Sequence, residues 1–134
     1  MHRSPVRDRQ KVWWVTIEEI HEGIDNIIKY GKPEMRKQTV SATSGTPEEI
    51  AAGIVPNYDR YVTHYKSKSK PFNPVEGMGV FVDVEPELDE TGNLVMEEDG
   101  YTPVTPPDYR LVKILDTKKG SVARYGISKV GGNQ

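Results

Sequence analysis

Few residues of this 134-residue chain have the type and spacing that catalysis requires. The three histidines, His2, His21 and His64, lack the spacing of metal ligands, and the absence of cysteine removes both thiolate ligands and a thiol nucleophile. Acidic pairs such as Glu18 and Glu19 are consecutive, so their carboxylates diverge on a strand. The glycines follow neither the phosphate-binding nor the dinucleotide-binding pattern. The sequence therefore predicts no enzyme, no metal site and no cofactor.

A short lysine row offers binding chemistry instead. Lys66, Lys68 and Lys70 alternate with serines, and Phe72 follows them. In an extended chain this alternation places the three ammonium groups on one side. We expect this row, with Phe72 beside it, to contact DNA phosphates or an acidic surface of a neighbouring subunit. The alternative is a solvated edge strand in which lysine prevents unwanted pairing.

Charge is distributed unevenly along the chain, although the formal net charge is only -2. Residues 1–70 are net basic, whereas residues 71–134 are net acidic. Most of the acidic residues of the second half lie within an insertion at residues 85–107. A turn signal at residues 89–93 predicts that part of this insertion forms a small acidic hairpin. Such a block is a solvated excursion or a counterpart for a basic surface on a partner or a second copy. The candidate interface residues in it are Glu85, Glu87, Glu97 and Glu98.

Two adjacent tryptophans mark a strand that is covered on both faces. Trp13 and Trp14 lie in an apolar run at residues 11–17, and neighbouring strand residues point to opposite faces. We expect one indole to pack in the core and the other to lie at an interface or under a covering arm. Both residues are therefore interface candidates.

The elements that must position these residues are mostly strands. Only 35% of the residues are hydrophobic and 28% are charged, which indicates a thin core that finishes burying its apolar surface against neighbours. We predict a mostly β single domain over residues 1–134, a small antiparallel β-barrel with one short helix and long projecting loops. A basic arm at residues 1–10 and a flexible tail at 131–134 flank it. Strands are expected at residues 11–17, on both sides of a turn up to residue 30, and at 35–40, 58–65, 78–84, 109–115 and 122–130.

The single helix follows turn chemistry at residues 41–45. Thr46 supplies a capping hydroxyl, Pro47 suits the first helical position, and Gly53 stops the helix after barely two turns. Glu48 and Glu49 complement the helix dipole. A helix this short must dock on the sheet or on a neighbour.

The order of these pieces resembles a family of phage proteins. The segments that carry the resemblance are residues 24–33, 40–45 with the helix that ends at Gly53, 57–60, 79–83, 108–113 and 125–130. They are similar to the head-closure, or head-tail connector, proteins of long-tailed phages of Gram-positive hosts. The similarity covers nearly the whole chain except the basic arm, the acidic insertion and the tail.

This resemblance implies a β-barrel subunit of a ring, typically a dodecamer, in the virion neck. The ring would sit below the portal and adaptor proteins, retain packaged double-stranded DNA, and present a surface to the tail terminator or tail tube. In the family, the loop with the short helix commonly projects toward the channel. Here that loop maps onto residues 41–56, with Ser41, Thr43, Ser44, Gly45, Glu48, Glu49 and Gly53 as channel-loop candidates.

Other readings remain open at the level of sequence. The acidic insertion departs from the family pattern and keeps open an adaptor or tail-terminator role. A small nucleic-acid-binding barrel is favoured by the lysine row but opposed by the negative net charge and the few aromatic residues. A small enzyme with an atypical acidic site at residues 83–99 is least favoured. No apolar run is long enough to span a membrane and the N-terminus lacks a signal-peptide core, so we expect synthesis in the host cytoplasm.

Overall fold

The computed structural model describes residues 9–23, 25–116 and 120–130. The predicted basic arm lies outside the described residues up to residue 8, and the predicted tail lies entirely outside them. The elements within them are β1 (Gln10–Val15), β2 (Ile17–Glu22), β3 (Asp25–Tyr30), β4 (Glu34–Val40), α1 (Pro47–Ala51), β5 (Arg60–Tyr65), β6 (Gly79–Phe81), β7 (Tyr109–Leu115) and β8 (Val122–Lys129).

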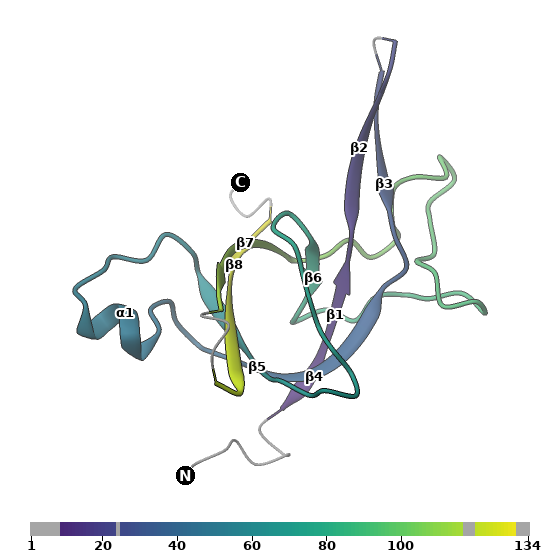
Figure 1. Cartoon of the computed structure of the whole chain (residues 1–134). Coiled ribbons are helices and arrows are strands. Elements are labelled where there is room, and N and C mark those ends of the chain that lie inside the picture. Colours follow the sequence, from purple (N-terminus) through teal and green to yellow (C-terminus); the bar gives the residue numbers. More distant parts are fainter. Residues whose placement is uncertain (1–8, 24, 117–119, 131–134) are drawn as a thin grey trace.

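Six strands close into a barrel in the order β1-β4-β5-β8-β7-β6, and β6 pairs with β1 to complete the ring (Figure 1). Neighbouring strands are antiparallel throughout. Closure leaves these strands without a free sheet edge, which removes the usual site of edge-to-edge aggregation. The predicted fold class, a mostly β chain with a small antiparallel barrel and one short helix, is confirmed.

Strand β1 is buried on both faces because it separates two apolar clusters. Val12 and Trp14 point into the barrel, where they meet residues of β5, β6, β7 and β8. Trp13 and Val15 point outward and pack with Phe81 of β6. Trp14 is fully buried and Trp13 is only 9% exposed. The prediction that the two indoles face opposite sides was correct, with Trp14 in the core and Trp13 under a covering segment of the same chain, one of the two placements expected for the second indole. Neither indole is exposed for contact with another subunit, which corrects their assignment as interface candidates.

The acidic excursion, residues 85–107, supplies the cover over Trp13. Leu94 is buried against Trp13, and Met96 packs on the same cluster. The predicted turn at residues 89–93 is present and is spanned by an antiparallel bridge between Leu88 and Leu94, so the acidic hairpin is reduced to one isolated bridge. A second isolated bridge joins Met96 to Pro103. The excursion therefore carries its carboxylates on the outside of a segment that is docked on the barrel.

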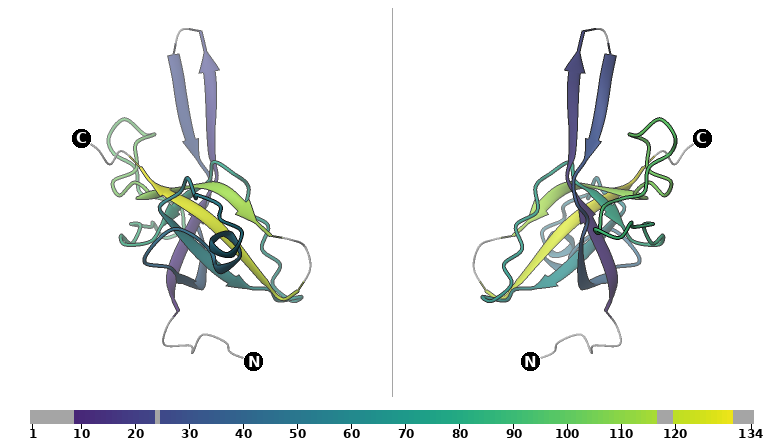
Figure 2. Two further views of the ribbon diagram at one scale, coloured as in Figure 1. Left: turned by 90° about the vertical axis from the view of Figure 1, so that its left-hand side faces the viewer. Right: turned by 90° about the vertical axis from the view of Figure 1, so that its right-hand side faces the viewer.

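Strands β2 and β3 form a two-stranded hairpin that projects away from the barrel (Figure 2). The prediction of two strands around a turn in this region is confirmed. At the hairpin's base the Gly31 amide donates to the Thr16 carbonyl at 2.9 Å. A Cβ atom at Gly31 would lie 2.1 Å from Thr16 Oγ1, so any other residue here would force the Thr16 side chain to rotate away. The hairpin thus extends from β1 and β4 at a fixed base.

Candidate functional site

Between β4 and β5 the chain leaves the barrel wall in a long segment that carries helix α1, here called the α1 arm (residues 41–59). It stands beside β8, on the side of the barrel opposite the acidic excursion (Figure 1). Its root is tied to β5: Ser41 Oγ accepts from the Tyr61 amide at 2.8 Å and donates to the Thr43 carbonyl at 2.6 Å. Arg60 Nε donates to the Ser41 carbonyl at 2.7 Å. Ser41 therefore fixes the start of the arm.

Helix α1 begins with a capping box. The Glu49 amide donates to Thr46 Oγ1 at 3.2 Å, and the Thr46 amide donates to Glu49 Oε1 at 3.1 Å. Pro47 occupies the first turn, as predicted. The three-residue spacing from Thr46 to Glu49 is the sequence signal for this reciprocal cap.

Glu49 anchors the arm to the barrel. Its carboxylate is 6% exposed, accepts a hydrogen bond from the Tyr58 hydroxyl, and lies 3.0 Å from Lys113 Nζ of β7. Burial alone would raise the pKa of Glu49, but the hydrogen bonds from Tyr58, Thr46 and Lys113 outweigh it and lower the pKa to about 2. Burial and the Glu49 charge raise the pKa of Tyr58 to about 12. Glu49 is therefore a buried anion that anchors the arm, and its carboxylate does not lie on the exposed surface of the predicted channel loop.

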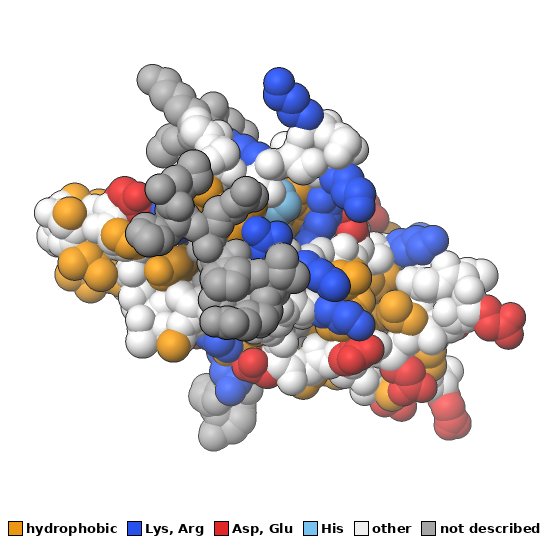
Figure 3. Space-filling model, turned by 90° about the horizontal axis from the view of Figure 1, so that it is seen from below, with side chains coloured by type: hydrophobic (Ala, Val, Ile, Leu, Met, Phe, Trp, Pro, Cys, Tyr) orange, Lys and Arg blue, Asp and Glu red, His pale blue; other side chains and the backbone are white. Residues whose placement is uncertain are grey.

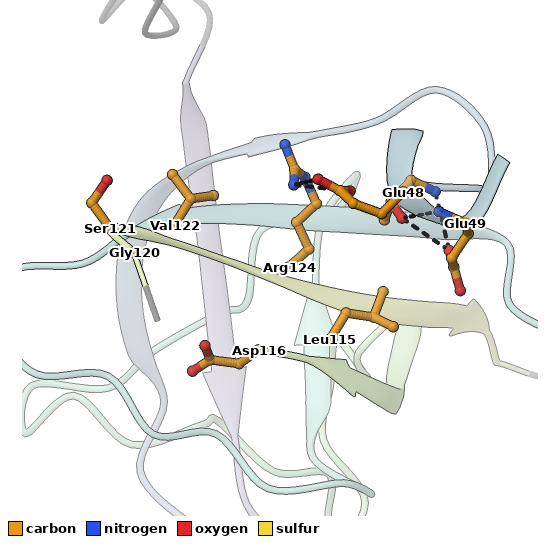
Figure 4. A pocket seen from close by; sticks show the side chains of 9 residues that line it. Glu48, Glu49, Leu115, Asp116, Gly120, Ser121, Val122 and Arg124 are labelled. Carbon is orange, nitrogen blue, oxygen red and sulfur yellow. Dashed lines mark hydrogen bonds and ion pairs between the residues drawn. The ribbon is translucent and has the colours of Figure 1, made fainter. Parts of the chain in front are cut away.

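Tyr58 also packs directly on the barrel wall. An added Cβ at Gly126 of β8 would lie 2.8 Å from Tyr58 Cγ, so the ring rests on bare backbone. A second ion pair joins Glu48 to Arg124 at 3.4 Å. Between this attachment and the ends of β7 and β8 lies a cleft of about 490 Å³, with Leu115 and Val122 on its barrel side (Figure 4). The arm thus touches the barrel through a few polar contacts and one aromatic ring, and does not fill the space beneath it.

The outer part of the arm is apolar and exposed. Ile50 is 68% exposed, Ile54 48% and Val55 89%. Of the predicted channel-loop residues, Thr43, Glu48 and Gly53 are exposed and Ser44 is half-buried. Gly45 is buried and has a φ of +91°, a backbone conformation that favours glycine, so its role is in the structure of the arm. The arm therefore presents isoleucine and valine outward, a feature that its sequence composition did not single out.

The lysine row does not form the predicted one-sided row of charges. The backbone bends at residues 68–70, so the alternation of an extended chain is lost. Lys66 Nζ lies 2.9 Å from Asp116, and Arg36 donates to the carbonyls of Lys70 and Pro71. Lys68 and Lys70 remain exposed, without an ion pair among the described residues. Of the three lysines predicted to bind phosphate or an acidic surface, only Lys68 and Lys70 are therefore exposed and outside an ion pair of the described chain.

Phe72 is a partly buried side chain that packs against the barrel core, which leaves only part of its ring for the predicted contact surface. Its ring centroid is 4.9 Å from that of Trp14, 4.8 Å from His64 and 5.6 Å from Tyr125. The connection from β5 to β6 crosses the open end of the barrel (Figure 1), and Phe72 plugs that end. The Arg36 guanidinium stacks over its outer face at 5.0 Å. Because the ring packs on the core and lies under Arg36, little of it is left for stacking with a base.

A buried polar chain runs beneath Phe72. Trp14 Nε1 donates to Gln38 Oε1 at 2.8 Å, and Gln38 Nε2 lies 3.0 Å from His64 Nδ1. Since the Gln38 amide nitrogen donates, Nδ1 must be the accepting nitrogen of His64. Burial and then the charges of Arg36 and Arg9 lower the pKa of His64, which favours the neutral ring. His64 thus stabilises the core as a hydrogen-bond acceptor.

Charges of both signs that have no ion pair among the described residues remain on the outside. The register places Lys11 of β1 directly opposite Lys37 of β4, a destabilising like-charge pair that the sequence did not reveal. Seen from below, Lys and Arg side chains gather over the middle of the molecule, and Asp and Glu lie toward the acidic excursion (Figure 3). The excursion's exposed carboxylates have no ion pair within the described part of the chain. These carboxylates include the four predicted interface residues Glu85, Glu87, Glu97 and Glu98.

No protein-family model, curated protein or solved structure matches this chain.

Among the described residues, no group of three or more His, Asp or Glu side chains is placed to hold a metal ion. No helix in that part of the chain is long and apolar enough to cross a membrane. The described surfaces are apolar at the α1 arm, acidic at residues 85–107, and basic near the lysine-rich segment.

The three lysines are expected to differ when each is changed to glutamate. Lys66→Glu places a negative charge beside Asp116 and should lower the free energy of unfolding by about 1 kcal/mol. Lys68→Glu and Lys70→Glu together should change it by less than about 0.5 kcal/mol because both side chains are exposed. Urea unfolding of each variant measures the difference. Equal losses at all three positions would contradict the placement of Lys66 alone in an ion pair.

Proposed function

We propose that this protein is a structural subunit of the phage neck. It forms a ring below the portal and adaptor proteins, closes the DNA-filled head and provides the surface to which the tail attaches. The observation that carries the proposal is the placement of two different unsatisfied surfaces on opposite sides of one closed barrel, the apolar α1 arm and the acidic excursion (Figure 1). A ring requires such a pair, because each subunit contacts its two neighbours through different patches.

The architecture supports this proposal in a second way. A closed barrel is a rigid core, and three segments leave it in different directions: the β2–β3 hairpin, the α1 arm and the acidic excursion (Figure 2). Recognition surfaces commonly lie on segments carried by a rigid scaffold. In a ring, the α1 arm and the excursion would lie between subunits, and the hairpin would reach an adjacent ring.

A nucleic-acid-binding barrel is the weaker alternative. Phe72 is partly buried against the core and lies under Arg36, so the lysine-rich segment lacks a fully exposed aromatic ring on which single-stranded bases stack. The exposed Lys68 and Lys70 are suited to phosphate contact of the kind expected along packaged DNA. Their role in the proposal is DNA retention within the ring.

Deletion of the gene from a phage that carries it tests the proposal. We expect heads that package DNA and then lose it, together with separate finished tails, in electron micrographs and measurements of head DNA content. The Lys68→Glu, Lys70→Glu variant supplied in trans should retain less DNA than the wild type. Tails of uncontrolled length would identify a tail terminator, and normal virions would overturn the proposal.

A further inference from the structure

We infer that the α1 arm of one subunit binds the acidic excursion of a second copy of this chain, with Ile50, Ile54 and Val55 forming the contact. This inference rests on the proposed ring and names the two surfaces that would meet in it. The occupant is a second copy because both halves of the contact are present, unsatisfied, on one chain.

The arm is held in a conformation that exposes its apolar side chains. Polar contacts attach it: Glu49 to Lys113 at 3.0 Å and Glu48 to Arg124 at 3.4 Å. The apolar side chains contribute little to that attachment, since Ile50, Ile54 and Val55 are 68%, 48% and 89% exposed. Single exposed apolar residues are ordinary, but several on one short anchored segment mark a contact surface.

The acidic excursion offers the matching surface. The inner side of the excursion packs on Trp13. Other apolar side chains of the excursion, and Val84 directly before it, are exposed. These are Val84 at 39%, Leu88 at 39%, Tyr101 at 51% and Val104 at 40%. The arm and the excursion lie on opposite sides of the barrel (Figure 1), so they cannot meet within one chain. Opposite placement is what a head-to-tail contact requires.

Charge favours the same contact. Two of the arm's three carboxylates, Glu48 and Glu49, are paired with cations of the barrel, and the third, Asp59, accepts the Lys129 amide at the base of the arm. The apolar outer part of the arm, residues 50–55, carries no charge and so brings no negative charge to an acidic surface. Arg124 is 29% exposed and holds Glu48 only at 3.4 Å, which leaves its guanidinium able to approach a second carboxylate. The unpaired carboxylates Glu97 and Glu98 on the excursion provide that partner.

Disulfide trapping tests the contact, because the natural chain has no cysteine. The variant Val55→Cys, Tyr101→Cys places one thiol on each proposed surface of the same chain. The matched control is Val75→Cys, Tyr101→Cys, since Val75 is 57% exposed but lies in the β5–β6 connection, outside both surfaces. Leu88→Cys and Val104→Cys in place of Tyr101→Cys sample the rest of the excursion. Each protein is oxidised in a preparation in which the wild type forms rings, and covalent oligomers are counted on a denaturing gel.

We expect a ladder of covalent oligomers when Val55→Cys is combined with at least one excursion cysteine, and monomers from the control pair and every single variant. Covalent dimers from Val55→Cys alone would indicate a two-fold exchange of arms and overturn the inference. Rings without any cross-link between arm and excursion would also overturn it, while leaving the proposed ring intact. If no preparation contains rings, the ring proposal fails and this inference fails with it.

Discussion

Trp14→Ala is expected to reduce the free energy of unfolding by about 3–5 kcal/mol, the usual cost of truncating a buried tryptophan. The side chain is completely buried, packs edge-on against Phe72 and Tyr125, and donates to Gln38. Its loss would open a cavity and leave the Gln38 carbonyl without its donor. Because the free energy of unfolding of a small domain is only about 5–15 kcal/mol, this change would remove a large fraction of it. Urea unfolding followed by circular dichroism measures the change.

Trp13→Ala separates the two faces of β1. It should cost about 3 kcal/mol, at the lower end of the range, because the excursion over it can partly collapse into the gap. Met35→Ala is the matched control: Met35 pairs with Trp13 across β1 and β4 but is 42% exposed, so its loss should be small. A Trp13→Ala variant with unchanged unfolding but abolished self-association would place Trp13 at a subunit interface and contradict its burial under Leu94.

Glu49→Ala is expected to release the α1 arm while the barrel stays folded. The change removes the partner of the Tyr58 hydroxyl and of Lys113, and an unsatisfied buried polar group costs about 1–3 kcal/mol. Lys113 is 38% exposed and regains water, so the lower half of that range is expected. Hydrogen exchange over residues 46–54 should accelerate, and ring formation should fall sharply. Glu48→Ala is the control, since Glu48 is 74% exposed and its ion pair is long. An unchanged exchange rate in Glu49→Ala would contradict the anchoring role.

The same anchor makes the arm sensitive to acid. The pKa of Glu49 falls from an ordinary 4.5 to about 2 in the folded protein, so the unfolded chain takes up the proton first as pH decreases. The stability that Glu49 contributes is therefore fully present above about pH 4.5 and is lost as the pH falls toward about 2. Glu49→Gln should lack this part of the pH dependence. Identical pH profiles for the wild type and Glu49→Gln would contradict the lowered pKa.

The barrel was predictable because each strand carries its own local signal. Residues 109–115 and 122–130 are bounded by turn formers and rich in β-branched and aromatic residues, and they became β7 and β8. The start of the helix was also predictable from the sequence, because Thr46, Pro47 and Glu49 have the residue types and spacing of a helix N-terminal cap. Local chemistry decides both features, so the surrounding fold did not need to be known.

The site was less predictable because its contacts join distant positions. Glu49 meets Lys113 and Tyr58 only once the barrel has formed, and nothing in the local sequence links them. Phe72 lies among lysines and prolines, yet the open end of a barrel must be filled by some apolar side chain. The acidic excursion is dominated by carboxylates, and Leu94 and Met96, which dock it on Trp13, are a minority in its composition.

The most direct test of the central claim is a mass measurement of the purified protein, alone and mixed with the portal and adaptor proteins of the same phage, followed by electron microscopy. A subunit of a neck ring should give a particle whose mass is a fixed integer multiple of 15.1 kDa, alone or bound to the portal complex, and closed rings in the micrographs. A protein that remains a 15.1 kDa monomer in every mixture, without binding the portal complex, would contradict the claim.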